Sequence, residues 1–193
     1  LLDKNRLQDA ERLISKYPGS SPDLVFQQGA LAFLKKDYSL AQKFFREAAR
    51  RASETTAENA LFNENLAALN ANDASGATAL IKEASGSSRL RESILFEQAH
   101  YAAKRMAPQA AELLANFITL AETPALKTQA RLDQVEVALN LNPPDLETVQ
   151  AILPLLEKEQ LSPEQTMQLA RLNILEAESR QAGVSGRKRR LVL

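Results

Sequence analysis

The 193-residue chain has no cysteine, no tryptophan and a single histidine, and aromatic residues fill only 5% of its positions. Without cysteine there can be no disulfide, no thiolate metal site and no cysteine nucleophile. His100 alone cannot complete a zinc site, which needs three or four protein ligands. Glu97 lies one helical turn before it, so a metal or proton-transfer pair is one interpretation. We favour the other, a histidine at a helix surface or core edge.

Long apolar runs and an excess of either charge are also missing. No stretch of about 18 apolar residues occurs, so we expect no membrane insertion within this chain. The 24 basic and 24 acidic residues cancel, which argues against a nucleic-acid partner, because such proteins need a basic surface. The sequence contains no G-x-S-x-G, P-loop or G-x-G-x-x-G motif. We therefore predict neither an enzyme nor a cofactor-binding protein, and no catalytic or metal residue.

What the chain does contain is apolar residues, mainly Ala and Leu, at helical spacing. They make up 45% of the sequence and lie between short loop signals such as Pro18 to Pro22 and Asn142 to Asp145. No segment shows the alternation of apolar and polar residues that is typical of a strand. The pattern predicts an all-α fold with helix pairs at about 22–52, 58–85, 90–122 and 125–159. A lone helix should follow at 163–181, where Ser162 can cap the first turn before Pro163, and residues 1–18 should form the second helix of a preceding unit.

A period of roughly 34 residues relates these pairs. The clearest unit, from Pro22 to Thr55, carries Gly29, Tyr38, Ala41-x-x-x-Phe45 and Ala48. The position of Gly29 returns as Asn65, Gln98, Val137 and Ala170, at steps of 36, 33, 39 and 33 residues. Close helix packing requires a small residue at each crossing, so we expect Gly29 and Ala41 to face each other.

This unit resembles the tetratricopeptide repeat, a two-helix unit of 34 residues. The resemblance covers roughly residues 5–181, within a predicted helical-repeat domain of residues 1–181. It implies a right-handed solenoid of antiparallel helix pairs, with about four repeats and partial terminal helices. It further implies a protein-binding scaffold whose concave groove receives a peptide or amphipathic helix of another protein. The partner-binding positions that this phase predicts are Phe26, Gln27, Phe33, Phe62, Asn63, Leu66 and Phe96. The alternative is that these phenylalanines pack one helix on the next.

Residues 182–193 are predicted to be a basic tail or linker, and the missing initiator methionine leads us to expect a piece of a longer polypeptide. The absence of cysteine and the Ala/Gln/Asn-rich composition favour a bacterial periplasm or cell envelope, although lack of cysteine fits the cytosol equally. Two further hypotheses stay open. The chain could be a structural spacer or self-association module of a larger envelope-associated protein, or an accessory domain of an enzyme.

Overall fold

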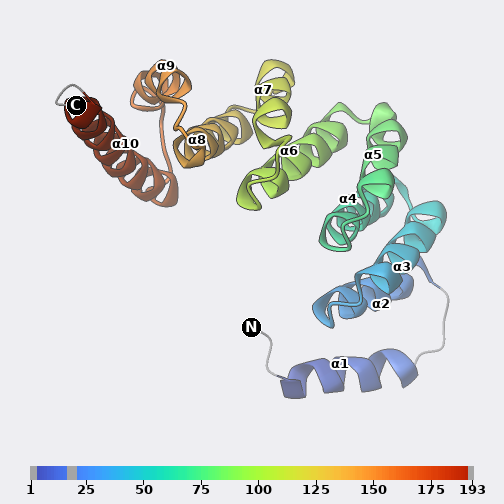
Figure 1. Ribbon diagram of the computed structural model, residues 1–193. Helices are drawn as coiled ribbons and strands as arrows, with labels where there is room; N and C mark the ends of the chain where they lie inside the picture. The colour runs from blue at the N-terminus through green and yellow to red at the C-terminus, as the bar shows by residue number, and fades with distance from the viewer. Residues whose placement is uncertain (1–3, 17–20, 191–193) are drawn as a thin grey trace. The chain divides into compact units, whose positions relative to one another are not determined.

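The computed structural model describes residues 4–16 and 21–190, and over these ranges it contains ten α-helices, one 3-10 turn and no strand (Figure 1). The predicted all-α class is therefore confirmed for this part of the chain. The elements are α1 (Lys4–Lys16), α2 (Pro22–Leu34), α3 (Tyr38–Arg51), α4 (Glu54–Asn70), α5 (Ala74–Glu83), η1 (Ala84–Gly86), α6 (Ser88–Lys104), α7 (Ala110–Leu120), α8 (Pro124–Asn140), α9 (Leu146–Leu156) and α10 (Pro163–Arg190).

The four predicted pairs correspond to α2–α3, α4–α5, α6–α7 and α8–α9, and α1 corresponds to the helix expected at the start. The last helix differs from the prediction. It begins at Pro163 as expected but continues to Arg190, so that residues 182–190 of the predicted tail belong to α10. The rest of that tail lies outside the described residues, as do positions 1–3, 17 and 18 of the first predicted helix.

The chain divides into two compact units, Leu1–Leu95 and Phe96–Leu193, with the boundary inside α6. In the first unit each of α2, α3 and α4 packs on the helix that follows it, α1 packs on α2, and α2 also contacts α4. In the second unit α7 packs on α8, α8 on α9, and α10 on both α8 and α9. Adjacent helices in the sequence are thus neighbours in space within each unit.

Side-chain caps fix where several of these helices begin. The carboxylates of Asp37, Asp73 and Asp145 accept a hydrogen bond from the amide three residues later, at 3.1, 2.8 and 3.1 Å. Such bonds satisfy amides that have no partner inside the helix. Ser162 behaves as predicted: its hydroxyl accepts from the amide of Gln165, whose side chain accepts in return from the Ser162 amide. This reciprocal pair is a capping box.

The same turn closes α2, α4 and α6. Lys36, Asn72 and Met106 each have a positive φ, of 64°, 58° and 50°. At each of them the amide donates to the carbonyl three residues back, and the next amide donates to the carbonyl five residues back. This pair of bonds defines the Schellman motif. The first helix of three successive pairs therefore ends in one repeated local geometry, at nearly the period found in the sequence.

In the first unit α2 and α3 approach each other closely at Gly29. A Cβ built on Gly29 would lie 2.8 Å from two ring carbons of Phe45. The side chain nearest to Gly29 is therefore Phe45, whose ring lies over the glycine, and not Ala41. Ala41 is fully buried nearby, in a cluster that includes Ala32, Phe45 and Ala67.

The core of the second unit joins α8, α9 and α10. It is built from Leu132, Val135, Ala138, Leu139, Val149, Ile152, Leu153, Leu156, Leu169 and Leu172. Burying each leucine removes apolar area from water and contributes about 1.5–3 kcal/mol. In α10, Leu169 and Leu172 are buried and Leu175 packs against the cluster. The side chain of Glu176 in the same helix is only 13% exposed and pairs with Arg180.

Candidate functional site

The predicted partner-binding residues of the first unit lie on α2 and α4, two helices in contact with each other. On α2, Phe26 is partly buried with its ring centre 5.3 Å from that of Phe45. Phe33 is also partly buried and meets Tyr38 edge to face at the same distance. Gln27 is exposed. The rings of Phe26 and Phe33 therefore pack within the unit and still keep part of their surface in solvent.

On α4, the ring of Phe62 packs against a buried cluster of Leu80, Leu90 and Ile94 and is itself partly buried. Asn63 donates its side-chain amide to the carbonyl of Asn59, one turn back, at 2.7 Å. Leu66 is partly buried. Helix packing therefore accounts for part of the surface of each phenylalanine, as the alternative interpretation expected.

Phe96 differs from the other predicted partner-binding residues. It belongs to the second unit and is only 8% exposed. Its ring stacks on His100 and lies against Phe117 of α7, with centres 5.4 and 5.5 Å apart. At this position α7 and the imidazole cover the ring, as the alternative interpretation of helix packing expected.

His100 has an acidic partner, but it is Asp133 of α8 and not Glu97. The imidazole Nδ1 lies 2.5 Å from a carboxylate oxygen of Asp133, whose side chain is completely buried. This hydrogen bond raises the pKa of His100 despite the opposing effect of burial. Burial also raises the pKa of the neighbouring Glu97 carboxyl. The predicted core-edge histidine thus takes part in a tie between α6 and α8 that spacing alone could not identify.

Further polar side chains extend this tie. Lys104 lies 3.7 Å from Asp133 and 3.2 Å from Glu136, and Gln129 donates to Asp133 at 3.2 Å. Gln168 of α10 donates to Glu136 at 3.3 Å. The network therefore balances the charge of the buried Asp133 carboxylate and links α6, α8 and α10 of the second unit.

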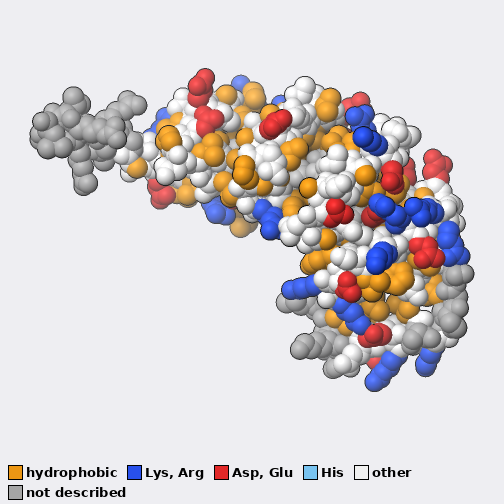
Figure 2. All heavy atoms as spheres, turned by 45° about the vertical axis from the view of Figure 1, so that its right-hand side comes forward, with side chains coloured by type: hydrophobic (Ala, Val, Ile, Leu, Met, Phe, Trp, Pro, Cys, Tyr) orange, Lys and Arg blue, Asp and Glu red, His pale blue; other side chains and the backbone are white. Residues whose placement is uncertain are grey.

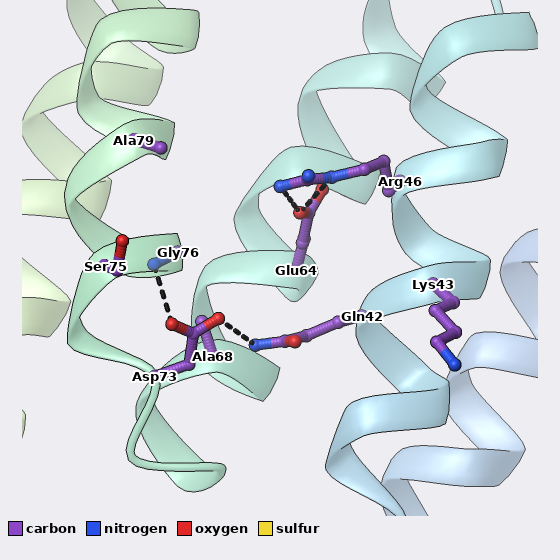
Figure 3. A pocket seen from close by; sticks show the side chains of 9 residues that line it. All are labelled: Gln42, Lys43, Arg46, Glu64, Ala68, Asp73, Ser75, Gly76 and Ala79. Atoms are coloured by element: carbon purple, nitrogen blue, oxygen red, sulfur yellow. Dashed lines mark hydrogen bonds and ion pairs between the residues drawn. The ribbon is translucent and has the colours of Figure 1, made fainter.

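A polar pocket of about 380 Å³ opens between α3, α4 and α5 (Figure 3). Asp73 caps α5, and a Cβ on Gly76 would lie 2.2 Å from its carboxylate oxygen Oδ2. Glycine at this position therefore lets the carboxylate fold over the first turn of the helix. The same oxygen accepts from the side chain of Gln42 on α3 at 3.4 Å. The hydrogen bond from Gln42 to Asp73 therefore links α3 to the start of α5.

The floor of the pocket is an ion pair between Arg46 of α3 and Glu64 of α4. Both Nε and Nη2 of Arg46 contact one carboxylate oxygen of Glu64, at 2.7 and 2.5 Å. The Glu64 side chain is only 2% exposed. Burial raises the pKa of this carboxyl, and the guanidinium opposes that shift. Its other oxygen, Oε2, is buried without a hydrogen-bond partner among the described residues.

This arrangement can hold three helices in register and can offer hydrogen-bond donors and acceptors at its rim. Lys43 and Ser75 are the exposed polar groups that line it, and the Lys43 ammonium points away from the ion pair (Figure 3). The nine lining residues include no histidine or cysteine. The pocket therefore has the chemistry of a polar contact point between helices rather than that of a nucleophile with its base.

Glu64 was missed by the sequence analysis, although a signal for it existed. It precedes Asn65, which the repeat phase placed at a helix contact and which is completely buried. A carboxylate beside such a position implies a cation on the preceding helix, and Arg46 supplies it. Asp133 offered no such signal, because its partner His100 lies 33 residues away.

Among the described residues, no group of three or more His, Asp or Glu side chains is arranged to hold a metal ion. None of the helices in that part of the chain is both long and apolar enough to cross a bilayer. On the face shown in Figure 2, basic and acidic side chains are interspersed among apolar ones. Comparison with protein-family models, curated proteins and solved structures finds no match to the chain.

Proposed function

We propose that this chain is a non-catalytic scaffold for protein–protein interaction, built from about four tetratricopeptide-like helix pairs arranged as a right-handed solenoid. The repeated Schellman turn at Lys36, Asn72 and Met106 supports the repeat. So does the succession of helices that pack on their neighbours within each unit. Stacked repeats of this kind create extended surfaces that bind other proteins.

The observation that carries the binding proposal is the contact between α2 and α4, the first helices of two successive pairs. Both present partly buried apolar side chains, among them Phe33 and Leu66, and α2 adds the exposed amide of Gln27. The partner is a peptide or amphipathic helix of another protein. Its apolar side chains cover the parts of Phe33 and Leu66 that remain exposed to solvent. Aromatic anchors of this kind dominate binding energy, whereas exposed charges mainly affect the association rate.

The test begins with a displayed-peptide library selected on the intact chain. Selected peptides are then titrated against variants by fluorescence anisotropy. Phe33→Ala should weaken binding by at least about 30-fold, the equivalent of roughly 2 kcal/mol, and added salt should have a smaller effect. Leu120→Ala is the matched control, since Leu120 is a 62% exposed apolar residue on α7 in the other unit. It should bind like the parent.

Two further variants separate this proposal from its rivals. Lys43→Glu changes the rim of the polar pocket without touching Phe33 or Leu66. If it abolishes binding while Phe33→Ala and Leu66→Ala do not, the partner binds at the pocket and the proposed face is wrong. Loss of affinity only in variants that also lose helicity by circular dichroism would mean that Phe33 and Leu66 serve the fold alone.

A further inference from the structure

Helix α10 (Pro163–Arg190) has one face in the core of the second unit and an opposite face in solvent. Leu169 and Leu172 are buried against α8 and α9. Half a turn away, Met167 and Ile174 are 75% and 61% exposed. Met167 and Ile174 are not part of the core that holds the helix on its unit.

The exposed apolar residues form a continuous stripe. Met167, Ala170, Ile174 and Ala177 follow one another at steps of three, four and three residues, and all four are exposed. This is the spacing at which one helix presents a seam to another helix in a coiled coil. Two of the four are alanines, which allow a second helix to approach closely. The stripe has the form of a helix-binding seam that no described residue covers.

Charges beside the stripe indicate what covers it. Arg171 and Glu178 are seven residues apart, so they lie on the same flank of the stripe. Both are exposed, and neither forms an ion pair with a described residue. Arg180 and Glu176 behave differently, since they pair with each other within the helix. Glu164, seven residues before Arg171, lies on the same flank, so that its charges follow one another as Glu164, Arg171 and Glu178. Arg171 and Glu178 are placed almost symmetrically about Ile174.

We propose that the stripe on α10 binds the α10 stripe of a second copy of this chain, antiparallel and about a twofold axis near Ile174. In that arrangement Arg171 of one copy lies beside Glu178 of the other, and the contact occurs twice. A parallel pairing would instead place Arg171 and Glu178 beside the opposite flank of the second helix, which carries Thr166 and Asn173, and would form neither ion pair. Such a self-complementary patch is what a twofold symmetric dimer requires.

This inference is independent of the partner-binding face on α2 and α4. The two surfaces lie in different units, and a dimer formed through α10 would require no peptide. Failure of one proposal therefore leaves the other standing. A dimer would, however, present two copies of the proposed binding face, which raises the apparent affinity for any partner with two binding segments.

Sedimentation equilibrium of the intact chain over a range of concentrations tests the proposal. The mass should rise from that of the 21.3 kDa chain toward twice that value as concentration increases. Ile174→Glu should keep the protein monomeric, because it puts an anion at the centre of the seam. Leu120→Glu introduces the same charge at an equally exposed leucine of α7 and should leave the dimer intact. Circular dichroism should show parent-like helicity in both variants.

A charge exchange then tests the antiparallel orientation. Arg171→Glu should weaken the dimer at least several-fold, and adding Glu178→Arg to it should restore most of the affinity, since each copy then pairs with the other again. The effect should shrink as salt is raised. A parent chain that is monomeric at every concentration would overturn the proposal. So would an Ile174→Glu variant that dimerises normally, or a double variant as weak as the single one.

Discussion

At Gly29 the backbone of α2 comes so close to α3 that one added methyl group would collide with the ring of Phe45. Alanine is favoured over glycine inside a helix by up to about 1 kcal/mol. Here that gain is opposed by overpacking of a buried ring, which costs about 1–3 kcal/mol. We therefore expect Gly29→Ala to lower the free energy of unfolding measured in urea.

The control for this prediction is Gly86→Ala, because nothing lies within 4 Å of a Cβ built on Gly86. That variant should be neutral or slightly stabilised. Equal effects of the two substitutions would mean that the contact between Gly29 and Phe45 does not constrain the helix pair.

His100 predicts a dependence of stability on pH. Its pKa in the folded protein is raised above the ordinary value near 6.5, mainly by the hydrogen bond to Asp133. The charged groups around it are Glu97 and Lys104 on α6 and Asp133 and Glu136 on α8. The stabilisation from the protonated pair is therefore complete below about pH 6.5 and is lost as the pH rises through the higher folded-state value.

Urea unfolding of the parent chain and of His100→Gln from about pH 5.5 to 8.5 measures this effect. The parent should lose stability over the upper part of that range. His100→Gln, which cannot take up a proton, should show a flatter dependence. Parallel curves for the two proteins would show that protonation of His100 does not stabilise the tie between α6 and α8.

Single residues were predicted unevenly from the sequence. The small buried positions Ala41 and Ala48 followed from periodicity, because a helix that packs closely must repeat small side chains on its inner face. The sequence did not predict that the ring of Phe45 would fill the space over Gly29, because this depends on the rotamer of Phe45. The partner of His100 did not follow either, because residues on different helices meet through packing and not through spacing.

At the scale of single elements, the turn after α6 makes a specific prediction. Met106 has a positive φ of 50° and is 43% exposed. The left-handed conformation costs an L-residue roughly 1–2 kcal/mol but costs glycine almost nothing. Met106→Gly should therefore raise the midpoint of thermal unfolding. The free energy of unfolding should increase by up to about 1 kcal/mol, because the larger entropy of glycine in the unfolded chain offsets part of the gain.

Gln150→Gly is the matched control, because Gln150 is an exposed residue inside α9. Glycine there should cost about 1 kcal/mol. Thermal unfolding by circular dichroism compares the two variants with the parent. If Met106→Gly were destabilising to the same degree, the Schellman turn would not form at this position.

Deletion of residues 163–193 tests what α10 contributes to its unit. The deletion would expose Leu132, Leu156 and the rest of the core cluster that Leu169 and Leu172 cover. An uncapped apolar end favours association and aggregation. We expect the truncated protein to aggregate, as measured by light scattering, and to melt at a lower temperature. Removing residues 1–16 should do much less, because Leu7, Ala10 and Ile14 of α1 are only partly buried.

A truncated protein that stays monomeric and equally stable would show that α10 is dispensable.

Helices themselves were the most predictable feature of the chain, since apolar spacing, prolines and capping side chains all act locally. The end of α10 at Arg190 was not predicted, because Gly183 and Gly186 follow Gln181 and glycine often ends a helix. Glycine weakens a helix by about 1 kcal/mol, which does not oblige it to stop.

For the whole molecule, the sequence predicted the number and order of helix pairs through one strong repeat and its period. The division into two units within α6 was not foreseen, because nothing in the composition near residue 95 departs from that of its neighbours. We propose that a partner contacts α2 and α4 and that α10 has a separate role, between copies of the chain.

Chemical-shift mapping by NMR of the isotope-labelled chain, titrated with a peptide selected on it, tests this claim most directly. We expect the largest shift changes in the amides of α2 and α4, at and around Gln27, Phe33 and Leu66. Changes concentrated at the rim of the polar pocket or along α10, with α2 and α4 unaffected, would contradict it.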